Sequence, residues 1–324
     1  MNKFLKILKQ FLKIETCIAL ATLFIGGIAI SFAAIFIKLS ESEISPNATT
    51  FNRLWIAFVA LGLWNGIKSI SIKLKPTEQS EKPQIYTPQN VGMLITLGLF
   101  YVTFQCVWAW SLTQTNIAIS TLLHNLTPIF ISLGAWLLFR QQFDGRFWIG
   151  MVLAVGGTIG LGLKDLQMTS GELGGDFAAL ISAVLYGGYL LTIEQLRPNL
   201  STNTILMWGS LIGTIVLLPI LLVNQEQLFP SSPLGWLAVI CLAFICHVIG
   251  QGLVIYSINQ LSATFVSLFL VLNPAFTAFE AGFILSEHLS FLSWISLFIS
   301  LLGVSLTFFS KSIHKQEKEP LNSI

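Results

Sequence analysis

Residues 104–130 read FQCVWAWSLTQTNIAISTLLHNLTPIF, and residues 250–276 read GQGLVIYSINQLSATFVSLFLVLNPAF. The two stretches align without a gap at a spacing of 146 residues. Chemically distinctive residues coincide along this alignment and its continuation: Gln105 with Gln251, Pro128 with Pro274, and Trp148 with Trp294. Apolar sequences match one another by chance, but coincident Gln, Pro and Trp residues are much harder to obtain in this way. The sequence therefore predicts an internal duplication.

The composition of the whole chain indicates that most of it faces lipid. Of its 324 residues, 54% are hydrophobic and only 10% are charged, with a mean hydropathy of +0.77, whereas a soluble domain carries about 25% charged residues. A soluble globular protein is therefore excluded. Seventeen Lys and Arg residues against fifteen Asp and Glu residues give a net charge of +2, which is too balanced for a protein that binds nucleic acid.

Ten runs of apolar residues are each long enough to cross a bilayer as a helix, which takes roughly 20 residues. The predicted spans are residues 17–39, 48–67, 91–112, 116–139, 146–163, 174–193, 203–223, 234–258, 261–285 and 290–310. Strands of a membrane β-barrel would alternate in polarity, but runs such as WISLFISLLGVSLTFF at residues 294–309 are apolar on every face. We therefore expect an all-α integral membrane protein with ten transmembrane helices.

The duplication divides these helices into two repeats of five. We expect the first repeat at residues 17–163, with a linker at about 68–90, and the second repeat at residues 174–310. Because five is an odd number, the second repeat must enter the membrane from the opposite side, which gives inverted topology about a pseudo-two-fold axis in the membrane plane. Exchanging the conformations of two such halves opens a midplane site to the other side. The architecture therefore indicates transport by alternating access.

The distribution of positive residues predicts the orientation, because Lys and Arg concentrate in cytoplasmic loops. With the N-terminus inside, fourteen of them lie on the cytoplasmic side, and only Lys38, Arg53 and Lys164 lie outside. Residues 1–16 and 311–324 are then a cytoplasmic N-terminal segment and a cytoplasmic tail. We expect a multi-pass protein of the plasma or inner membrane, present as a monomer or loose dimer, with no nucleic-acid partner.

Two longer stretches resemble the EamA family of the drug/metabolite transporter superfamily. They are LLHNLTPIFISLGAWLLFRQQFDGRFWIGMVLAVGGTIGL at residues 122–161 and SLFLVLNPAFTAFEAGFILSEHLSFLSWISLFISLLGVSLTF at residues 267–308. Each looks like the family's apolar helix with a Pro, an LGERL-like corner and a Gly-rich closing helix. The second corner keeps the acid as Glu287, whereas Gln141 stands at the corresponding place in the first.

The resemblance implies ten helices in two repeats and the movement of small metabolites, often amino acids or related amphipathic compounds, without ATP hydrolysis. No phosphate-binding GxxxxGK[ST] loop occurs in the sequence, consistent with that mode of transport. Lys38 and Arg53 are similar to the family's basic positions at the end of the first helix and within the second.

Polar side chains inside the spans are the candidates for a central cavity, because a polar group in hydrocarbon must find a partner or water. Gln105 with Trp108, and His247 with Gln251, lie on one helix face each by their spacing. Other candidates flank a helical Pro or small residues. The full set is Tyr101, Gln105, Trp108, His124, Asn125, Tyr186, Tyr189, His247, Gln251 and Asn273. Hydrogen-bonded cross-linking of helices and packing at Pro kinks are alternative roles for these residues.

Glu280, near one end of the ninth span, is a candidate for a proton-coupling or gating acid, together with the basic residues Lys38 and Arg53. The alternative is that Glu280 only pairs with one of these two basic groups. Three GxxxG patterns predict close helix contacts: Gly62 and Gly66, Gly156 and Gly160, and Gly209 and Gly213.

The leading functional hypothesis is a secondary carrier that exports small metabolites, with the bilayer and a small-molecule substrate as partners and the proton as coupling ion. Carriers of nucleotide sugars or sugar phosphates and a non-transporting membrane scaffold are the alternatives. An enzyme is not expected, because His124 and His247 stand alone without an HExxH motif. The four cysteines lie in apolar runs without metal-ligand spacing, so no cofactor or metal is expected.

Overall fold

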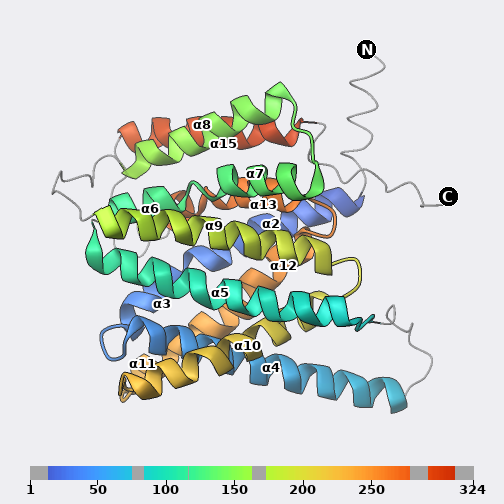
Figure 1. Ribbon diagram of the computed structural model, residues 1–324, viewed down its shortest axis with the longest axis vertical. Coiled ribbons are helices and arrows are strands. Elements are labelled where there is room, and N and C mark those ends of the chain that lie inside the picture. The colour runs from blue at the N-terminus through green and yellow to red at the C-terminus, as the bar shows by residue number, and fades with distance from the viewer. Residues whose placement is uncertain (1–13, 75–83, 116, 163–172, 278–290, 311–324) are drawn as a thin grey trace.

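The structure is a computed structural model that describes residues 14–74, 84–115, 117–162, 173–277 and 291–310 (Figure 1). Its helices run across the view of Figure 1 side by side, from α8 and α15 at the top to α4, α10 and α11 at the bottom. Six helical segments are long and apolar enough to cross a membrane, three more are shorter apolar helices, and α4 is long but carries several polar residues. This architecture confirms the prediction of an all-α membrane protein with about ten helices in two halves.

The first half contains these helices, in chain order: α2 (Ile14–Ser31), α3 (Ala33–Ser40), α4 (Pro46–Leu74), α5 (Pro88–Gln114), α6 (Ile117–His124), α7 (Thr127–Phe139) and α8 (Gly145–Gly162). Two of the predicted spans are divided. The first span is α2 followed by α3, and the fourth is α6 followed by α7, which begins beside Pro128 because Pro cannot continue the hydrogen bonding of the preceding helix. Helix α4 continues to Leu74, past the predicted start of the linker at residue 68, since no Pro occurs between Pro46 at its start and Pro76.

The second half contains α9 (Leu173–Leu196), α10 (Thr202–Val223), α11 (Pro233–Cys241), the π-helix η1 (Leu242–Gln251), α12 (Gly252–Ser257), α13 (Ala263–Leu270) and α15 (Phe291–Phe308). The eighth span is therefore α11, η1 and α12 in succession. The π-helical stretch was not predicted, because the apolar pattern of the sequence does not distinguish it from an α-helix. The last part of the predicted ninth span, residues 278–285, lies outside the described residues.

Corresponding helices of the two halves lie antiparallel. Asn47, at the start of α4, donates from Nδ2 to Oε1 of Glu226, just after α10, at 3.3 Å. Asn65, farther along α4, contacts Sδ of Met207 near the start of α10 at 3.5 Å. Because α4 and α10 are the second spans of their respective halves, the two halves are inverted with respect to each other, as an odd number of spans in each half requires.

The two halves are interleaved rather than placed next to each other. The major helix pairs combine one helix from each half, and five of them pair corresponding or exchanged spans: α5 with α9, α4 with α10, α8 with α15, α7 with α13, and α2 with η1 and α12. When the halves are exchanged, the first to fifth spans take the places of the sixth to tenth in order, and the reverse. The pair of α5 and α9, the third and sixth spans, then becomes the pair of α2 with η1 and α12, the first and eighth spans. The other three pairs map onto themselves. The pairing therefore has the symmetry of a two-fold axis through the middle of the bundle.

The closest helix crossing, between α8 and α15, lies on this axis. The hydroxyl of Ser300 donates to the carbonyl of Ala154 at 3.1 Å, and these residues are 146 positions apart, so they are equivalent in the two repeats. A Cβ on Gly303 would overlap the backbone of Ala154. A Cβ on the equivalent Gly157 would lie 2.6 Å from the backbone nitrogen of Ser300. The approach of the two backbones therefore requires glycine on both sides.

The GxxxG prediction holds for some glycines and is wrong for others. Gly160, Gly209 and Gly213 each lie against side chains of a neighbouring helix. A Cβ on Gly62, Gly66 or Gly156 would meet no described atom within 4 Å. The spacing identifies a small-residue face, but it does not show whether another helix covers that face.

Candidate functional site

Tyr101 and His247 meet on the pseudo-two-fold axis. They are 146 residues apart, which is the repeat spacing, and Oη of Tyr101 lies 3.3 Å from Nδ1 of His247. Both side chains are buried, at 6% and 4% exposure. Two positions related by a two-fold axis touch each other only where the axis passes between them. The pair therefore marks the axis, with Tyr101 supplied by α5 and His247 by η1.

Both ring nitrogens of His247 have partners. Its Nε2 lies 3.0 Å from Oγ of Ser210 on α10, opposite the nitrogen that faces Tyr101. One nitrogen donates and the other accepts in a neutral imidazole, so the hydroxyls of Tyr101 and Ser210 orient themselves accordingly. Ser210 was not among the residues predicted from the sequence; its position beside Gly209 in an apolar helix was the available signal.

The two glutamines that coincide in the repeat each bond to a tyrosine hydroxyl. Gln105 donates from Nε2 to Oη of Tyr101 at 3.4 Å, and Gln251 donates from Nε2 to Oη of Tyr189 at 3.1 Å. The rings of Tyr101 and Tyr189 lie 5.3 Å apart. These four residues and His247 form a continuous polar group, which we name the axial cluster. The glutamines therefore point into the bundle.

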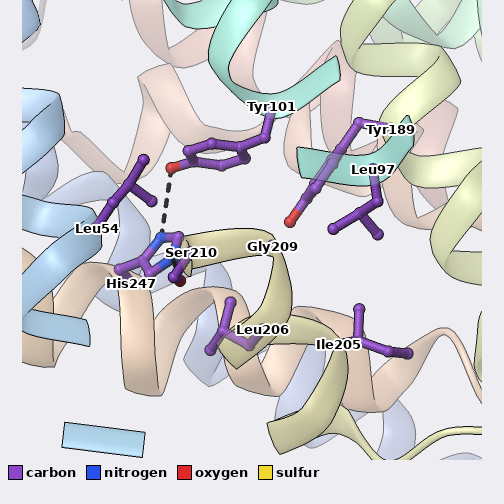
Figure 2. A pocket seen from close by; sticks show the side chains of 9 residues that line it. All are labelled: Leu54, Leu97, Tyr101, Tyr189, Ile205, Leu206, Gly209, Ser210 and His247. Atoms are coloured by element: carbon purple, nitrogen blue, oxygen red, sulfur yellow. Dashed lines mark hydrogen bonds between the residues drawn. The ribbon is translucent and has the colours of Figure 1, made fainter. Parts of the chain in front are cut away.

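A small cavity lies beside the axial cluster (Figure 2). Its walls come from α4, α5, α9, α10 and η1, and the lining residues are Leu54, Leu97, Tyr101, Tyr189, Ile205, Leu206, Gly209, Ser210 and His247. About 10 Å³ is open to the centre of a water-sized sphere, which is room for about one water molecule. In this conformation the cavity is too small for a metabolite, so a larger ligand requires the helices to move apart.

An aromatic cluster adjoins the axial cluster. Phe104 bridges the two, with its ring centroid 5.3 Å from that of Tyr101 and 4.8 Å from that of Tyr186. His124 lies 5.3 Å from Trp108, centroid to centroid, and its Nδ1 is 2.8 Å from Oγ of Ser182. The structure thus brings together eight of the ten cavity candidates, arranged as one aromatic and one polar surface.

The other two cavity candidates are asparagines beside the helix breaks. Asn125 lies between α6 and α7, and Asn273 follows α13. The buried Nδ2 of Asn125 and the buried Oδ1 of Asn273 have no hydrogen-bond partner among the residues that the structure describes. Unpaired buried polar atoms are uncommon in folded proteins, so both residues remain candidates for binding a ligand or water.

The three residues predicted for coupling or gating have different surroundings. The side chain of Arg53 on α4 is buried, with an exposed fraction of 7%, and its Cζ lies 5.6 Å from the ring centroid of Tyr101. Lys38, in the last turn of α3, is exposed. Glu280 lies outside the described residues. The structure thus places Arg53 at the axial cluster and Lys38 away from it.

His247 and Gln251 both lie on the π-helix η1. A π-helix has wider turns than an α-helix, and such segments occur frequently at functional sites. The wide turns let His247 contact α10 while Gln251, one turn later, contacts Tyr189 on α9. The feature that positions the second half's polar residues was therefore not predicted.

One end of the bundle is closed by two carboxylates that join the halves. Glu43, between α3 and α4, accepts hydrogen bonds at Oε2 from the amides of Ser231 and Ser232, each at 3.0 Å. Glu226 accepts from Nδ2 of Asn47 and from the hydroxyl of Ser45. We name this set of contacts the carboxylate clasp. It ties the connection before α4 to the connection between α10 and α11.

The opposite end is closed by uncharged groups. The amide of Ile85, before α5, donates to the carbonyl of Asn199, after α9, at 3.3 Å. Gln84 accepts from the hydroxyl of Thr204 at 2.6 Å and donates to Oγ of Ser201 at 3.3 Å. We name these contacts the amide clasp. Each clasp joins a connection of the first half to a connection of the second half, so the bundle is closed at both ends.

The carboxylate clasp depends on the charge of Glu43. Hydrogen bonds from Ser232, and more weakly from Ser231, hold the pKa of the Glu43 carboxyl below its usual value. A lowered pKa in the folded protein means that the ionised form stabilises the fold. This contribution is complete above the pKa of the unfolded chain, about 4.3, and is lost as the pH falls through the lower folded value.

We therefore expect Glu43→Gln to lower the melting temperature of the purified protein at pH 7. The difference from the unsubstituted protein should disappear below about pH 4, where both side chains are uncharged. Glu15→Gln, at an exposed position on α2, is the matched control and should have no effect at either pH. A difference for Glu43→Gln that stays constant from pH 7 to pH 3 would contradict a role for the charge.

The structure describes no group of three His, Cys, Asp or Glu side chains that could hold a metal ion within the residues it covers. What it does contain is a multi-pass bundle of two inverted, interleaved halves, with buried polar side chains on the axis and a closure at each end. This combination is typical of membrane transporters built from inverted repeats. Residues 17–163 and 173–309 match the EamA-like transporter family, and the chain belongs to that family. It is accordingly a transporter-family protein and not an enzyme.

The chain is similar to proteins of known sequence and to a protein of known structure. The chain is similar to an uncharacterized transporter of Synechocystis sp., with 28% identity over 249 residues that cover 70% of this chain and 74% of the relative. It is 26% identical over 276 residues to an uncharacterized transporter of Archaeoglobus fulgidus, covering 84% of this chain and 91% of the relative. A solved crystal structure has the same fold, with a TM-score of 0.71 at 17% identity, covering 90% of this chain and 96% of the other.

Proposed function

We propose that this protein is a secondary-active transporter that exports small metabolites, such as amino acids or related amphipathic compounds, by alternating access around the axial cluster. The observation that carries the proposal is the contact between Tyr101 and His247 at equivalent positions of the two repeats. A ligand bound on the axis faces both halves, so an exchange of their conformations presents the same ligand to either side of the membrane.

The two clasps support this mechanism because they are separate. The carboxylate clasp and the amide clasp use different connections at opposite ends of the bundle. Either one can open while the other stays closed, which is the requirement for moving a solute without forming a continuous pore. The closed state with its small cavity then corresponds to an intermediate between two open states.

The surroundings of the axis favour an amphipathic substrate. The axial cluster offers hydroxyl, amide and imidazole groups, whereas Phe104, Trp108 and Tyr186 offer an apolar aromatic wall next to it. A compound with a polar head and an apolar body can use both surfaces.

The proposed orientation follows from the positive residues, which favour cytoplasmic termini and a plasma or inner membrane location. We keep the proton as the proposed coupling ion and Glu280 as the proposed coupling acid. Replacing Glu280 with Gln and measuring transport against external pH tests this assignment, since an unchanged profile would remove it.

Flux measurements in proteoliposomes test the proposed function. We expect the purified full chain to catalyse saturable counterflow of at least one radiolabelled compound from a panel of the twenty amino acids, with UDP-glucose and GDP-mannose included to represent nucleotide sugars. Liposomes without protein are the control. Counterflow of a nucleotide sugar alone would favour the alternative carrier class, and binding without any flux would contradict transport.

A further inference from the structure

Arg53 is an unusual residue for the interior of a membrane bundle. Of the Lys, Arg, Asp and Glu side chains that the structure describes, it is the one that is buried. It makes no ion pair with any described residue, and its buried Nε has no hydrogen-bond partner. A charge buried in this way is costly unless a partner of opposite charge is supplied.

The partner that Arg53 does have lies in the axial cluster. Its guanidinium lies over the ring of Tyr101, 5.6 Å from the centroid, which is a cation–π contact. None of the guanidinium N–H groups donates a hydrogen bond to a described residue, so they are available to a ligand. Arg53 is thus held beside the axis by an interaction that does not consume its donors.

Two other cavity candidates in the bundle also have an unpaired buried donor. Nε1 of Trp108, in the aromatic cluster, and Nδ2 of Asn125, next to His124, are buried without a hydrogen-bond partner. These two atoms and Nε of Arg53 lack an acceptor, whereas the unpaired Oδ1 of Asn273 lacks a donor. A ligand that satisfies the three donors must therefore be rich in acceptor oxygens.

The positive charge occurs in one half only. Ser45 caps α4 through the amide of Ala48, and Ser201 caps α10 through the amide of Thr204, so the two caps define a common register. Arg53 is eight residues after Ser45, and Gly209 is eight residues after Ser201. Gly209 lines the cavity. The first half therefore places a guanidinium at a position where the second half has no side chain.

We infer that Arg53 binds the anionic group of the substrate, and that this group is a single carboxylate on a small compound with an apolar body. The inference rests on the proposed function. A carboxylate matches the parallel N–H groups of one guanidinium, and the aromatic cluster accepts the apolar part. A diphosphate carries more charge than one buried cation balances, and Lys38 is exposed.

A thermal-shift titration of the purified full chain in detergent tests the inference. The probes are 3-phenylpropanoate and its neutral isostere 3-phenylpropanamide, with L-phenylalanine and L-phenylalaninamide as a second pair. A ligand of the folded state raises the melting temperature in proportion to its occupancy. We expect at least one acid to bind about tenfold or more tightly than its amide, since hydrogen bonds to charged groups are the stronger kind.

Variants separate a binding role from a structural one. Arg53→Gln should abolish the preference for the acid over the amide, and Arg53→Lys, which keeps the charge but loses the paired donors, should reduce it. Lys38→Gln should leave it unchanged. If Arg53 only balances another charge such as Glu280, Arg53→Gln lowers the melting temperature measured without ligand, but the preference for the acid over the amide persists. The inference is then wrong. An equal response to acid and amide in the unsubstituted protein would also overturn it, and this measurement needs no variant.

The two proposals fail in different ways. Acid binding that depends on Arg53 without counterflow in proteoliposomes would contradict transport but not the anion site. Counterflow of a compound whose binding shows no dependence on its negative charge would contradict the anion site but not transport.

Discussion

Replacing Gly303 with alanine is expected to destabilise the protein by about 1–3 kcal/mol, the usual cost of overpacking. The added Cβ would overlap the backbone of Ala154 and lie 2.5 Å from the carbonyl oxygen of Gly150. Backbone atoms cannot move aside as the end of a flexible side chain can, so α8 and α15 would have to separate along the axis. The melting temperature of the purified protein in detergent measures the effect.

Gly156→Ala is the matched control for this substitution. Gly156 lies on α8, next to Gly157, but a Cβ there would meet no described atom within 4 Å. Alanine is favoured over glycine in a helix by roughly 0.5–1 kcal/mol, so this variant should be as stable as the unsubstituted protein or more so. Equal losses for Gly303→Ala and Gly156→Ala would show that the crossing of α8 and α15 is not the close contact described above.

Tyr101→Phe is expected to reduce transport by about tenfold or more while the protein still folds. The change keeps the aromatic ring under Arg53 but removes the hydroxyl that contacts both His247 and Gln105. A buried group left without its partner costs about 1–3 kcal/mol, and each 1.4 kcal/mol is a factor of ten. The ratio kcat/KM for counterflow measures the effect, with the melting temperature recorded beside it.

Tyr256→Phe provides the corresponding control. Tyr256 lies on α12, on the same span as His247, but its side chain is 45% exposed. Removal of its hydroxyl should leave kcat/KM unchanged. If both tyrosine variants retain full activity, the hydrogen bonds of the axial cluster are not part of the transport site.

The sequence was sufficient to predict the helices and the inverted relation of the halves, for a physical reason. Lipid requires long apolar runs, and a duplication of five helices leaves no choice of direction for the second copy. The same register of 146 residues that aligned Gln105 with Gln251 also aligns Tyr101 with His247, so their meeting on the axis follows from the repeat once the two halves are interleaved. The sequence identified these four residues, but only the structure shows which of them touch.

Other features depend on packing that no pattern in the chain encodes. The π-helix η1 has the composition of an ordinary apolar helix. Gly62 and Gly156 have the same spacing to a second glycine as Gly209, yet only Gly209 is covered by a neighbouring helix. Burial of Arg53 beside Tyr101 also could not be predicted, because a basic residue within a span can equally lie in the interior or reach the membrane surface.

The central claim is that the two ends of the bundle open alternately around the axial cluster. Pulsed electron–electron resonance distances across each end test it most directly, in the reconstituted protein with its four native cysteines replaced. One pair of spin labels is placed at the exposed residues Ser42 and Gln227, beside the carboxylate clasp, and a second pair at the exposed residues Tyr86 and Pro198, beside the amide clasp. The account predicts a short and a long distance at each end, with conditions that lengthen one shortening the other. Distances that lengthen together at both ends, or that do not change at either end, would contradict it.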